Sequence, residues 1–424
     1  MANEKDYMPT EAGLARDAQG DQVERLQDYL MRYGYIESGA QESFGLQTVR
    51  GMAAPAPEQR GRFGDNTVKA LTHFQEFNNL PVTGELDQAT VNRMSQPRCG
   101  VPDVAEFANT GRRWPTTNLT YAFQNFSPDL NQAQTIQAIE QAFALWSAET
   151  TLCFRRVALN AAPHIIIRFV ASDHGDGSPF DGPSGVLAHA FFPPVPPNAP
   201  DPIQGDTHFD EAETWTITVP PPAGTIDLVT VAAHEFGHAL GLNHSSVAGA
   251  LMAPFYGGPH RFLSSDDRAG IQAIYGGYPI ANASWIHGTS VQVEFPDQLE
   301  SIRRFGFFTR VVGNANTFNW FHFAIPTPVI VNDDRKVVGP VILRFITGGT
   351  NAVVQHVDVW DADSRIAAHH DINLSGSQLF VKLGVPHCPP AVFGLGISVG
   401  VRFGGGTATE RRVDFISAGC DFRP

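Results

Sequence analysis

The segment HEFGHALGLNH, which begins at His234, has the residue types and spacing of a metal site. His234 and His238 are four residues apart, so on a helix both imidazoles face the same side and can reach one ion. Gly241 can take the left-handed conformation that ends a helix, which turns the chain and brings His244 round as a third ligand. Three protein ligands leave one position open, as in a catalytic zinc site. Glu235 is then suited to take a proton from water at the metal.

The alternative is three unrelated histidines on a buried helix. With 15 His and 40 Gly among 424 residues, this five-position pattern is expected by chance in fewer than ~10⁻⁴ such chains. The segment therefore predicts zinc.

A second stretch with metal chemistry is PRCGVPD, residues 97–103. A thiolate is a strong zinc ligand, and zinc ionises a coordinating thiol. If Cys99 took the fourth position on the metal, it would exclude the hydrolytic water and silence the site. Arg98 and Asp103 flank the cysteine and could anchor its loop by hydrogen bonds across a cleft. The alternative is a spare surface thiol.

The elements that must position these residues alternate between strand and helix patterns over residues 104–277. NLTYAF (118–123) and HIIIRFV (164–170) are typical of strands, and a helix is predicted near 226–241 under the three histidines. Residues 132–149 predict an amphipathic helix whose inward face carries Ile136, Ile139, Phe143 and Trp146.

The N-terminal segment predicts three short helices. Residues 21–36 place Val23, Leu26 and Leu30 on one face. GRFGDNTVKALTHFQEFNNL follows, with Asp65 as the expected N-cap and an apolar face of Val68, Leu71, Phe74 and Phe77. LDQATVNRM would form the third helix, capped by Asp87.

After residue 280 the pattern changes to period two. Leu395, Ile397, Val399, Val401 and Phe403 alternate with small or polar residues, which is typical of half-buried strands. Residues 285–424 are therefore expected to form an all-β domain of sandwich type. A propeller is not expected, because no repeat of 40 to 50 residues is visible.

Composition and charge exclude some classes of function. The chain has 42% hydrophobic and 17% charged residues, and Gly 40 and Pro 31 indicate many turns. A net charge of −14 argues against a nucleic-acid partner, which needs clustered Lys and Arg. No stretch reaches the length of a membrane-spanning helix, and no signal peptide is visible at the N-terminus.

Four cysteines are too few for a disulfide scaffold. Cys388 and Cys420 lie in the same C-terminal segment and could pair with each other. Cys153 lies in the strand-like run TLCFRRV and is expected to be a buried thiol. His369 and His370 are interpreted as a solvated pair rather than metal ligands.

These motifs together resemble those of the matrixins, the matrix metalloproteinase family. HExxHxxGxxH followed by a methionine turn is the metzincin signature, and ALMAPFY (250–256) supplies that turn, with Met252 as an apolar floor under the histidines. Ser245 and FLSSDDRAGIQAIYG (262–276) narrow the resemblance to matrixins. PRCGVPD matches the family's cysteine switch, and GRFGDNTVKALTHFQEFNNLPVTGELDQAT resembles the peptidoglycan-binding-like fold of its prodomain.

The resemblance implies further sites. It implies a structural zinc with four ligands and no open position, and a calcium ion held by oxygen ligands. The zinc ligands would be His174, Asp176, His189 and His208, and the calcium ligands Asp181, Gly182, Ser184, Val186, Asp210 and Glu213. Asp206 matches a position that helps hold a second calcium in the family, but the Pro-rich run FFPPVPPNAPDPIQGDT is longer than the family norm, so that the other ligands of that ion cannot be aligned.

The resemblance also places a substrate cleft. VLAHAF (186–191) would be the edge strand to which an extended peptide adds. Ala188, Val231, Pro254 and Tyr256 would line this cleft. Activation would cut the chain within 104–117, where Arg112-Arg113 offers a dibasic site.

The expected fold class is therefore α+β and multidomain. It comprises a flexible tail (1–20), a peptidoglycan-binding-like helical prodomain (21–95), a switch and activation segment (96–117), a metzincin zinc-protease domain with a twisted mixed sheet and three helices (118–277), and a C-terminal β domain (278–424).

The expected function is that of a latent zinc endopeptidase that cleaves extracellular proteins, silenced by Cys99 until an activating protease removes the prodomain. Its partners would be protein or peptide substrates. The resemblance implies secretion. The alternative is a cell-wall or glycan-binding protein that uses the N- and C-terminal domains. A protein with only structural zinc is a third interpretation.

Overall fold

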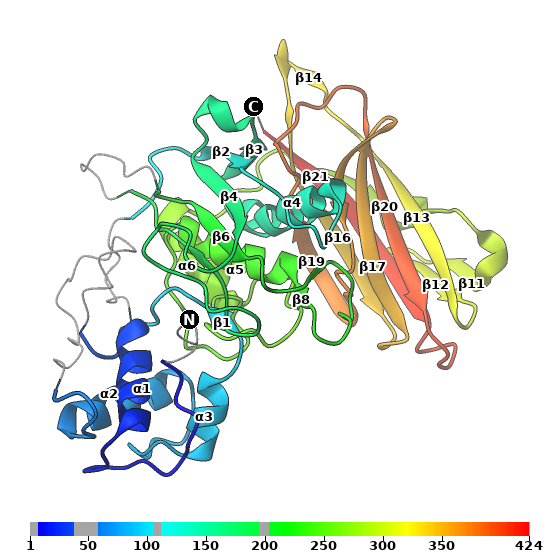
Figure 1. The fold of residues 1–424 in the computed structure, drawn as a ribbon. Helices are drawn as coiled ribbons and strands as arrows, with labels where there is room; N and C mark the ends of the chain where they lie inside the picture. Colours follow the sequence, from blue (N-terminus) through cyan, green and yellow to red (C-terminus); the bar gives the residue numbers. More distant parts are fainter. Residues whose placement is uncertain (1–6, 38–57, 105–111, 195–202, 424) are drawn as a thin grey trace. The chain divides into compact units, whose positions relative to one another are not determined.

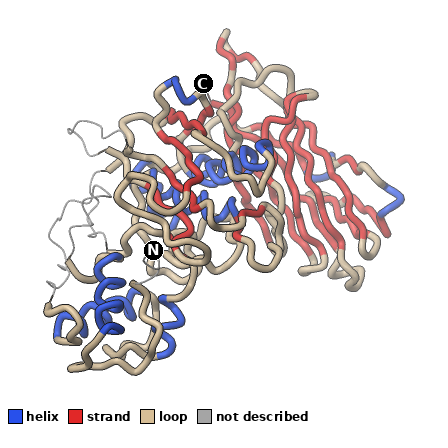
Figure 2. Tube along the Cα trace, in the orientation of Figure 1, coloured by secondary structure: helices blue, strands red, loops and turns tan. Residues whose placement is uncertain are grey.

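The computed structural model describes residues 7–37, 58–104, 112–194 and 203–423. The chain divides into two compact units (Figure 1). The first contains residues 1–116, 120–135 and 157–274, and the second contains residues 117–119, 136–156 and 275–424. Helices predominate at the N-terminal end of the chain and strands at the C-terminal end (Figure 2), so the α+β class is confirmed. In the described part of the chain no helix is long and apolar enough to cross a membrane.

Three helices form the N-terminal region of the first unit: α1 (Asp21–Arg32), α2 (Asp65–Phe77) and α3 (Gln88–Met94). The predicted apolar faces meet in one core, in which Val23, Leu26, Leu71 and Phe74 are fully buried. The predicted helical bundle is therefore confirmed. Residues 7–20, expected to be a flexible tail, instead pack onto it, and Leu14 bridges to Leu86.

One predicted helix cap is confirmed and the other is wrong. The Asp87 carboxylate accepts a hydrogen bond from the Thr90 N–H at 2.8 Å, which caps α3. Asp65 is the first residue of α2, and Gly64 is its N-cap without a side-chain acceptor. The Glu58 carboxylate supplies that acceptor from outside the helix and takes the Thr67 N–H at 2.7 Å.

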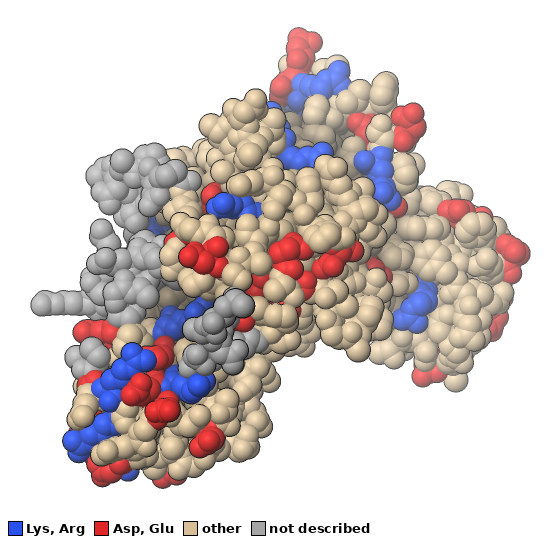
Figure 3. Space-filling model, in the orientation of Figure 1, with Lys and Arg blue, Asp and Glu red and all other residues tan. Residues whose placement is uncertain are grey.

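Acidic and basic side chains lie side by side over the helical region on the face drawn in Figure 3. Arg60, for example, pairs with Glu24 at 3.1 Å and with Asp28 at 2.7 Å.

A mixed sheet forms the centre of the first unit. Its strands lie in the order β1 (Arg98–Cys99), β5 (Val186–Ala190), β6 (Thr207–Asp210), β4 (Ile165–Val170) and β2 (Asn118–Phe123). Only β5 and β6 are antiparallel among these neighbours. The unit also contains η2 (Leu159–Ala161), the short pair β7 (Trp215–Thr216) and β8 (Ile226–Asp227), and helices α5 (Leu228–Ala239) and α6 (Ser265–Tyr275).

The second unit contains a β-sandwich and, from residue 136 onwards, helix α4 (Gln132–Glu149). A five-stranded sheet, β10-β13-β20-β17-β18, and a six-stranded sheet, β11-β12-β21-β16-β19 with β9 on β21, share one apolar core. The sandwich strands are β9 (Ser284–His287), β10 (Gln292–Val293), β11 (Leu299–Arg304), β12 (Thr309–Gly313), β13 (Thr317–Ile325), β16 (Val337–Thr347), β17 (Ala352–Asp361), β18 (Ser364–His369), β19 (Ser377–Leu383), β20 (Leu395–Phe403) and β21 (Arg412–Arg423). The unit also contains β3 (Cys153–Arg156), which is not part of the sandwich, the separate pair β14 (Ile330–Val331) and β15 (Asp334–Arg335), and the short helices η3 (Gly288–Ser290) and η4 (Pro296–Gln298). The predicted all-β character is confirmed.

The cysteine pairing differs from the expectation. Cys153 is not a thiol but forms a disulfide with Cys388, and Cys420 is a free, buried cysteine. The Cα atoms of the bonded pair lie 6.0 Å apart, within the range that a disulfide requires. A link across 235 residues stabilises the folded state by about 2–5 kcal/mol, mainly by restricting the unfolded chain.

Both cysteines lie in the second unit, whose boundary does not follow the predicted domain boundary at residue 278. Helix α4 adds polar contacts with the C-terminal strands, because Glu140 pairs with His387 at 2.8 Å and Gln141 donates to the His370 carbonyl at 3.0 Å. The interpretation of His369 and His370 as a solvated pair is wrong. His369 is buried, and His370 contacts Asp358 at 3.0 Å.

Candidate metal centres

Helix α5 carries the first two histidines of the main centre. Its N-terminus is capped by Asp227, whose carboxylate accepts from the Thr230 N–H at 3.2 Å, and every residue of the helix is buried. The helix ends at Ala239, and Gly241 then takes a φ of 106°. The predicted left-handed turn is confirmed. A Cβ at Gly241 would also meet the Arg112 carbonyl oxygen at 2.5 Å, so only glycine fits.

The three imidazoles of this centre are held in one orientation. The Nδ1 atom of His234 faces the Leu251 carbonyl at 2.8 Å, and that of His238 faces the Leu242 carbonyl at 2.7 Å. The Nδ1 atom of His244 lies 3.0 Å from the Asp103 carboxylate. Such partners for the distal nitrogen fix the tautomer and turn each Nε2 towards a common point.

The geometry of the Nε2 atoms fits a zinc ion. The His234 Nε2 atom lies 3.2 Å from that of His238 and 3.2 Å from that of His244. Two nitrogens on a tetrahedral zinc, each bonded at about 2.0–2.1 Å, are roughly 3.3–3.4 Å apart. Burial lowers the pKa of all three imidazoles, that of His234 to about 3. The rings are therefore neutral, as metal ligands must be.

Cys99 completes a four-ligand set with these histidines. All four residues are buried, and their ligand atoms lie within 4.8 Å of one another. Burial and the nearby Glu235 carboxyl raise the pKa of the Cys99 thiol well above its usual value, so a thiolate at this position needs a cation. The donor set, three nitrogens and one sulfur, is one that zinc prefers.

The cysteine segment lies between two walls of the cleft. Strand β1 pairs in parallel with β5, with Cys99 opposite Ala188. Gly100 N–H donates to the Ala188 carbonyl at 2.8 Å on one side, and Cys99 N–H donates to the Pro254 carbonyl at 2.9 Å on the other. The edge strand that was expected to receive a substrate therefore receives residues 98–100.

Gly100 makes the closest approach to β5. A Cβ at this position would lie 2.7 Å from the Val186 Cγ1 atom and 3.4 Å from the Ala188 carbonyl oxygen. A side chain here would push the segment away from the strand, because the 2.7 Å contact with Val186 cannot be accommodated without a shift.

Arg98 and Asp103 join the segment to the helical region and to the metal centre. Arg98, 2% exposed, forms an ion pair with Asp103 and lies over the Tyr33 ring. Asp103 also accepts from the Tyr35 hydroxyl at 2.8 Å. Although burial works against ionisation, Arg98 and His244 hold the pKa of Asp103 below its usual value. Asp103 is thus a charged acceptor that links the loop to a histidine of the centre.

Glu235 is fully buried beside the centre. Burial raises its pKa to about 8. A carboxyl group with a raised pKa next to a metal position has the properties of a general base that also returns a proton.

Met252 lies in the turn beneath the histidines and is buried. Sequence reasoning missed the residue that holds this turn. Asp267, from the first turn of α6, accepts from the N–H groups of Leu251 at 2.9 Å and Met252 at 3.0 Å. Its only local signal is the run Ser264, Ser265, Asp266 and Asp267 at a helix start, which is also typical of ordinary capping.

A cavity of about 480 Å³ adjoins the centre, lined among others by His234 and Glu235. Three of the predicted cleft residues, Val231, Pro254 and Tyr256, line it, whereas Ala188 lies instead on the pairing edge of β5. The Tyr256 hydroxyl accepts from the Asp227 N–H at 3.0 Å, which ties the cleft wall to the start of α5.

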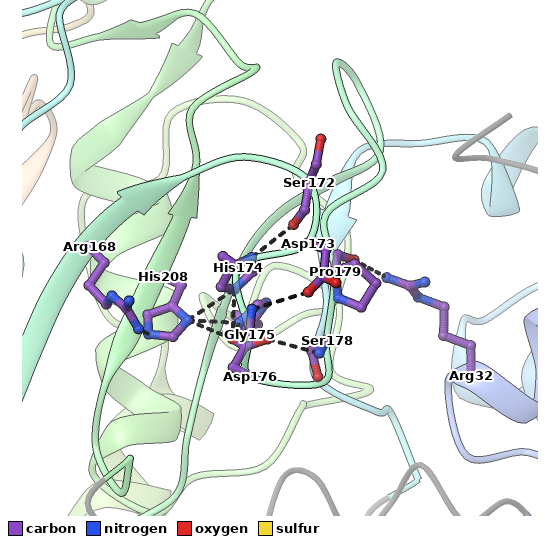
Figure 4. Close-up of polar contacts among 11 residues, drawn as sticks. Arg32, Arg168, Ser172, Asp173, His174, Gly175, Asp176, Ser178, Pro179 and His208 are labelled. Atoms are coloured by element: carbon purple, nitrogen blue, oxygen red, sulfur yellow. Dashed lines mark hydrogen bonds and ion pairs between the residues drawn. The ribbon is translucent and has the colours of Figure 1, made fainter. Parts of the chain in front are cut away.

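The second cluster is formed by the four residues expected for a structural zinc. Three of them, His174, Asp176 and His208, are labelled in Figure 4. His189 and His208 lie directly opposite each other on β5 and β6, and His174 and Asp176 lie in the loop after β4. The Asp176 Oδ2 atom is 2.6 Å from His174 Nε2, 2.9 Å from His189 Nε2 and 2.7 Å from His208 Nδ1.

The second cluster also fits zinc, as a closed site. All four side chains are at most 4% exposed, and their ligand atoms lie within 4.8 Å of one another. Burial lowers the pKa of His189 to about 4 and also lowers that of His208, so these two rings are neutral. Although burial works against it, the Asp176 carboxylate raises the pKa of His174. Four ligands with no open position are typical of a structural site.

The residues expected to bind calcium are only partly brought together. Asp181, Asp210 and Glu213 are all buried, and Glu213 accepts from the Ser184 N–H at 2.6 Å, which joins the two segments. Asp181 instead accepts from the Val186 N–H at 2.7 Å and from the Tyr7 hydroxyl at 2.6 Å. Among the described residues, these three carboxylates do not form a third compact ligand cluster. Gly182, like Ser184, has a positive φ.

The expected second calcium ligand, Asp206, is buried, and its carboxylate accepts from the Ile166 N–H at 3.0 Å. Burial raises its pKa to about 7.

Half of the expected activation segment, residues 105–111, lies outside the described residues. Arg112 is 6% exposed, and its guanidinium lies over the Phe192 ring. Cleavage at Arg112-Arg113 therefore requires local opening in this form of the chain.

Comparisons with known proteins match three consecutive regions of the chain to families. Residues 19–94 match the family described as Putative peptidoglycan binding domain, residues 113–276 match Matrixin, and residues 280–423 match a Family of unknown function, DUF6623.

Among similar proteins are two collagenases. The chain is 47% identical to interstitial collagenase of Equus caballus over 260 residues, which is 60% of this chain and 50% of that protein. It is 48% identical to neutrophil collagenase of Homo sapiens over 214 residues, which is 49% of this chain and 44% of that protein. The chain thus spans about half the length of the relatives that it matches.

Proposed function

Given that residues 113–276 are a matrixin domain behind a peptidoglycan-binding-like region, we propose that this chain is a latent zinc-dependent endopeptidase. The observation that carries the proposal is the position of Cys99 with His234, His238 and His244. Three histidines alone would leave a position for catalysis, and the cysteine occupies it. The prodomain then acts as an internal inhibitor.

The proposed reaction is hydrolysis of an internal peptide bond. His234, His238 and His244 would hold the zinc ion, which would supply Lewis-acid polarisation of the scissile carbonyl and of the attacking water. Glu235 accepts the proton of that water and passes it to the leaving nitrogen. The carbonyl groups of Leu251 and Leu242 keep the imidazoles of His234 and His238 oriented throughout.

The substrate class follows from the edge strand. Once residues 98–100 leave, β5 offers the Gly185 and Ala188 carbonyls that they had used, and an extended peptide can take them over through its own N–H groups. Main-chain pairing accepts many sequences, and the cavity at Val231 and Tyr256 would select one side chain. We therefore infer extracellular proteins with extended segments as substrates. The relatives' names indicate that collagen is a substrate of those proteins.

We also propose a structural zinc site and a calcium site in the same domain. His174, Asp176, His189 and His208 would hold a structural zinc. The Asp181 to Val186 loop and the Asp210 to Glu213 segment would hold calcium, supported by their joining hydrogen bond and their buried carboxylates. An activating protease would cut between the switch and the catalytic strands.

The first test is activation of the intact chain. Incubation with trypsin or a mercurial should convert an inactive protein with two zinc ions into one that cleaves casein or gelatin, with a new N-terminus within 104–117. Metal analysis, N-terminal sequencing and a cleavage assay report these together. An intact chain that is already fully active, or that holds no zinc, would contradict the proposal.

Replacing Gly100 with alanine should weaken latency in part. The added Cβ meets the Val186 side chain and the Ala188 carbonyl, so residues 98–100 should detach from β5 more often. The gain in activity of the uncut chain should be smaller than the gain on losing the Cys99 thiol. We expect several-fold faster labelling of Cys99 by a thiol reagent and partial activity of the uncut chain.

Gly306→Ala is the matched control for this variant, because a Cβ there has no neighbour within 4 Å. Equal labelling rates in the two variants would mean that the contact with β5 does not hold the switch.

The match of residues 19–94 to a peptidoglycan-binding family favours a second candidate, a cell-wall binder. Cosedimentation of the intact chain with purified peptidoglycan discriminates between the two. Binding there, combined with no cleavage of casein or gelatin after processing, would favour the second candidate.

A further inference from the structure

The C-terminal sandwich carries a groove that the proposed protease activity does not use. It covers about 530 Å³ on the five-stranded sheet, over strands β13, β20 and β17, which lie side by side (Figure 1). This volume is within the usual range of small-molecule sites. Two tryptophans, Trp320 and Trp360, contribute to its lining.

The central strand forms the floor because its outward residues are small. Gly396, Ser398 and Gly400 alternate with the buried Ile397 and Val399, so all three small residues face outward. A strand in the middle of a sheet with two outward glycines leaves a channel between its neighbours.

Larger side chains on the neighbouring strands form the walls. On β13, Trp320 lies opposite Gly400 and His322 lies opposite Ser398. On β17, Asp358 lies opposite Ser398 and Trp360 lies opposite Gly396. Cross-strand partners project to the same face of a sheet. The two tryptophans therefore stand on opposite walls and at opposite ends of the channel.

The channel over β20 is covered by aromatic rings at its Gly400 end and is open at its Gly396 end. A Cβ at Gly400 would lie 2.7 Å from the Phe318 ring and 3.0 Å from the Trp320 ring, whereas a Cβ at Gly396 would have Trp360 Cβ, at 4.0 Å, as its nearest neighbour. Trp320 thus lies over the strand, and the channel is free near Trp360.

Polar groups at the middle of the channel are pre-oriented. His322 Nδ1 lies 2.9 Å from the Ser398 hydroxyl, and His322 Nε2 lies 3.0 Å from the Glu294 carboxylate. Asp358, 6% exposed, is held by His370 on its other side. Hydrogen-bond donors and acceptors therefore converge between the two aromatic walls.

We propose that this groove binds a neutral polysaccharide chain. Sugar rings combine an apolar C–H face, which packs on an indole ring, with hydroxyl groups that exchange hydrogen bonds with carboxylate, imidazole and serine. Trp320 and Trp360 lie two strands apart and are offset by four residues along the strand direction. Their backbone positions are therefore roughly 16 Å apart. A ligand that contacts both would be an extended chain of several sugar rings.

Two other ligand classes fit less well. A peptide binds a sheet through an unpaired edge, but the groove runs over β20, whose main chain pairs with β13 and β17 on both sides. Polyanions are disfavoured by Glu294 and Asp358. The Ser398–His322–Glu294 arrangement is not a hydrolytic site either, because the paired strand offers no free N–H groups to stabilise an oxyanion.

The test uses the intact chain with Glu235→Gln, so that proteolysis does not interfere. Cellohexaose, xylohexaose and chitohexaose are titrated by calorimetry and by tryptophan fluorescence, with polygalacturonate and a proline-free peptide as comparisons. We expect saturable binding to at least one neutral hexaose and no binding to the comparisons. No binding to any neutral hexaose, or tighter binding to polygalacturonate or the peptide, would overturn the proposal.

Variants locate the site. Trp320→Ala and Trp360→Ala should each weaken binding at least tenfold, and Trp285→Ala is the matched control, since Trp285 is 40% exposed on β9 of the other sheet. Gly396→Leu adds a side chain into the open end without removing a contact, and should abolish binding while the melting temperature stays near that of the parent. Binding that survives all three groove variants would show that the groove is not the site.

Discussion

The uncut chain carrying Cys99→Ser is expected to cleave peptides without any processing. The thiolate is tethered next to the metal position, where an internal ligand acts at an effective concentration on the order of millimolar or above. A serine hydroxyl stays protonated at neutral pH and is a poor zinc ligand. We therefore expect the activity of the uncut chain on a fluorogenic peptide to rise by at least roughly 10²-fold, with unchanged zinc content.

The control for this substitution is Cys420→Ser, which removes the other free, buried thiol and should leave the intact chain latent. Activity is to be measured on protein whose intact length is verified by mass spectrometry. A Cys99→Ser chain that stays as inert as the parent, yet becomes active after trypsin, would mean that the prodomain blocks the cleft without using the sulfur. The hydrogen bonds of residues 98–100 to β5 and to Pro254 would then be the inhibitory contact.

Glu235→Gln is expected to remove turnover while both metal sites stay filled. The amide keeps the shape of the side chain but cannot accept and return a proton, and general acid–base catalysis contributes about 10²–10⁴-fold to the rate. The measurement is made in the Cys99→Ser background, in which activity does not depend on processing. Zinc is counted in the same samples.

Glu76→Gln serves as the matched control, because Glu76 lies exposed on α2 and the same charge is lost. Two outcomes would contradict the role of Glu235. Retained turnover would assign the proton transfer to another group, and a loss of zinc along with activity would show that Glu235 supports the centre rather than the reaction.

The main centre was largely predictable because its information is local. The spacing of His234 and His238 requires only a helix, and Gly241 requires only the end of that helix. Both features are present in α5. The sandwich was predictable for the same reason, since alternation over residues 395–403 reports one buried and one outward face of a strand.

Caps and tails were predicted less well. Asp65 was the expected cap of α2, but Glu58 supplies the acceptor from a preceding loop. Residues 7–20 lack a periodic pattern and were expected to be flexible, yet Leu14 and Tyr7 pack against partners far along the chain. Such contacts depend on surfaces that exist only after folding.

The sequence by itself determined the ligand types, their spacing on α5, the presence of a cysteine motif and the class of each region. Tertiary structure decided the partners: Cys99 opposite Ala188, Cys153 with Cys388, Asp267 under the methionine turn, and two tryptophans beside the glycines of β20. The physical reason is that helix and strand periodicity arises from neighbours a few residues apart, whereas register and disulfide pairing depend on the packing of segments that are distant in the chain.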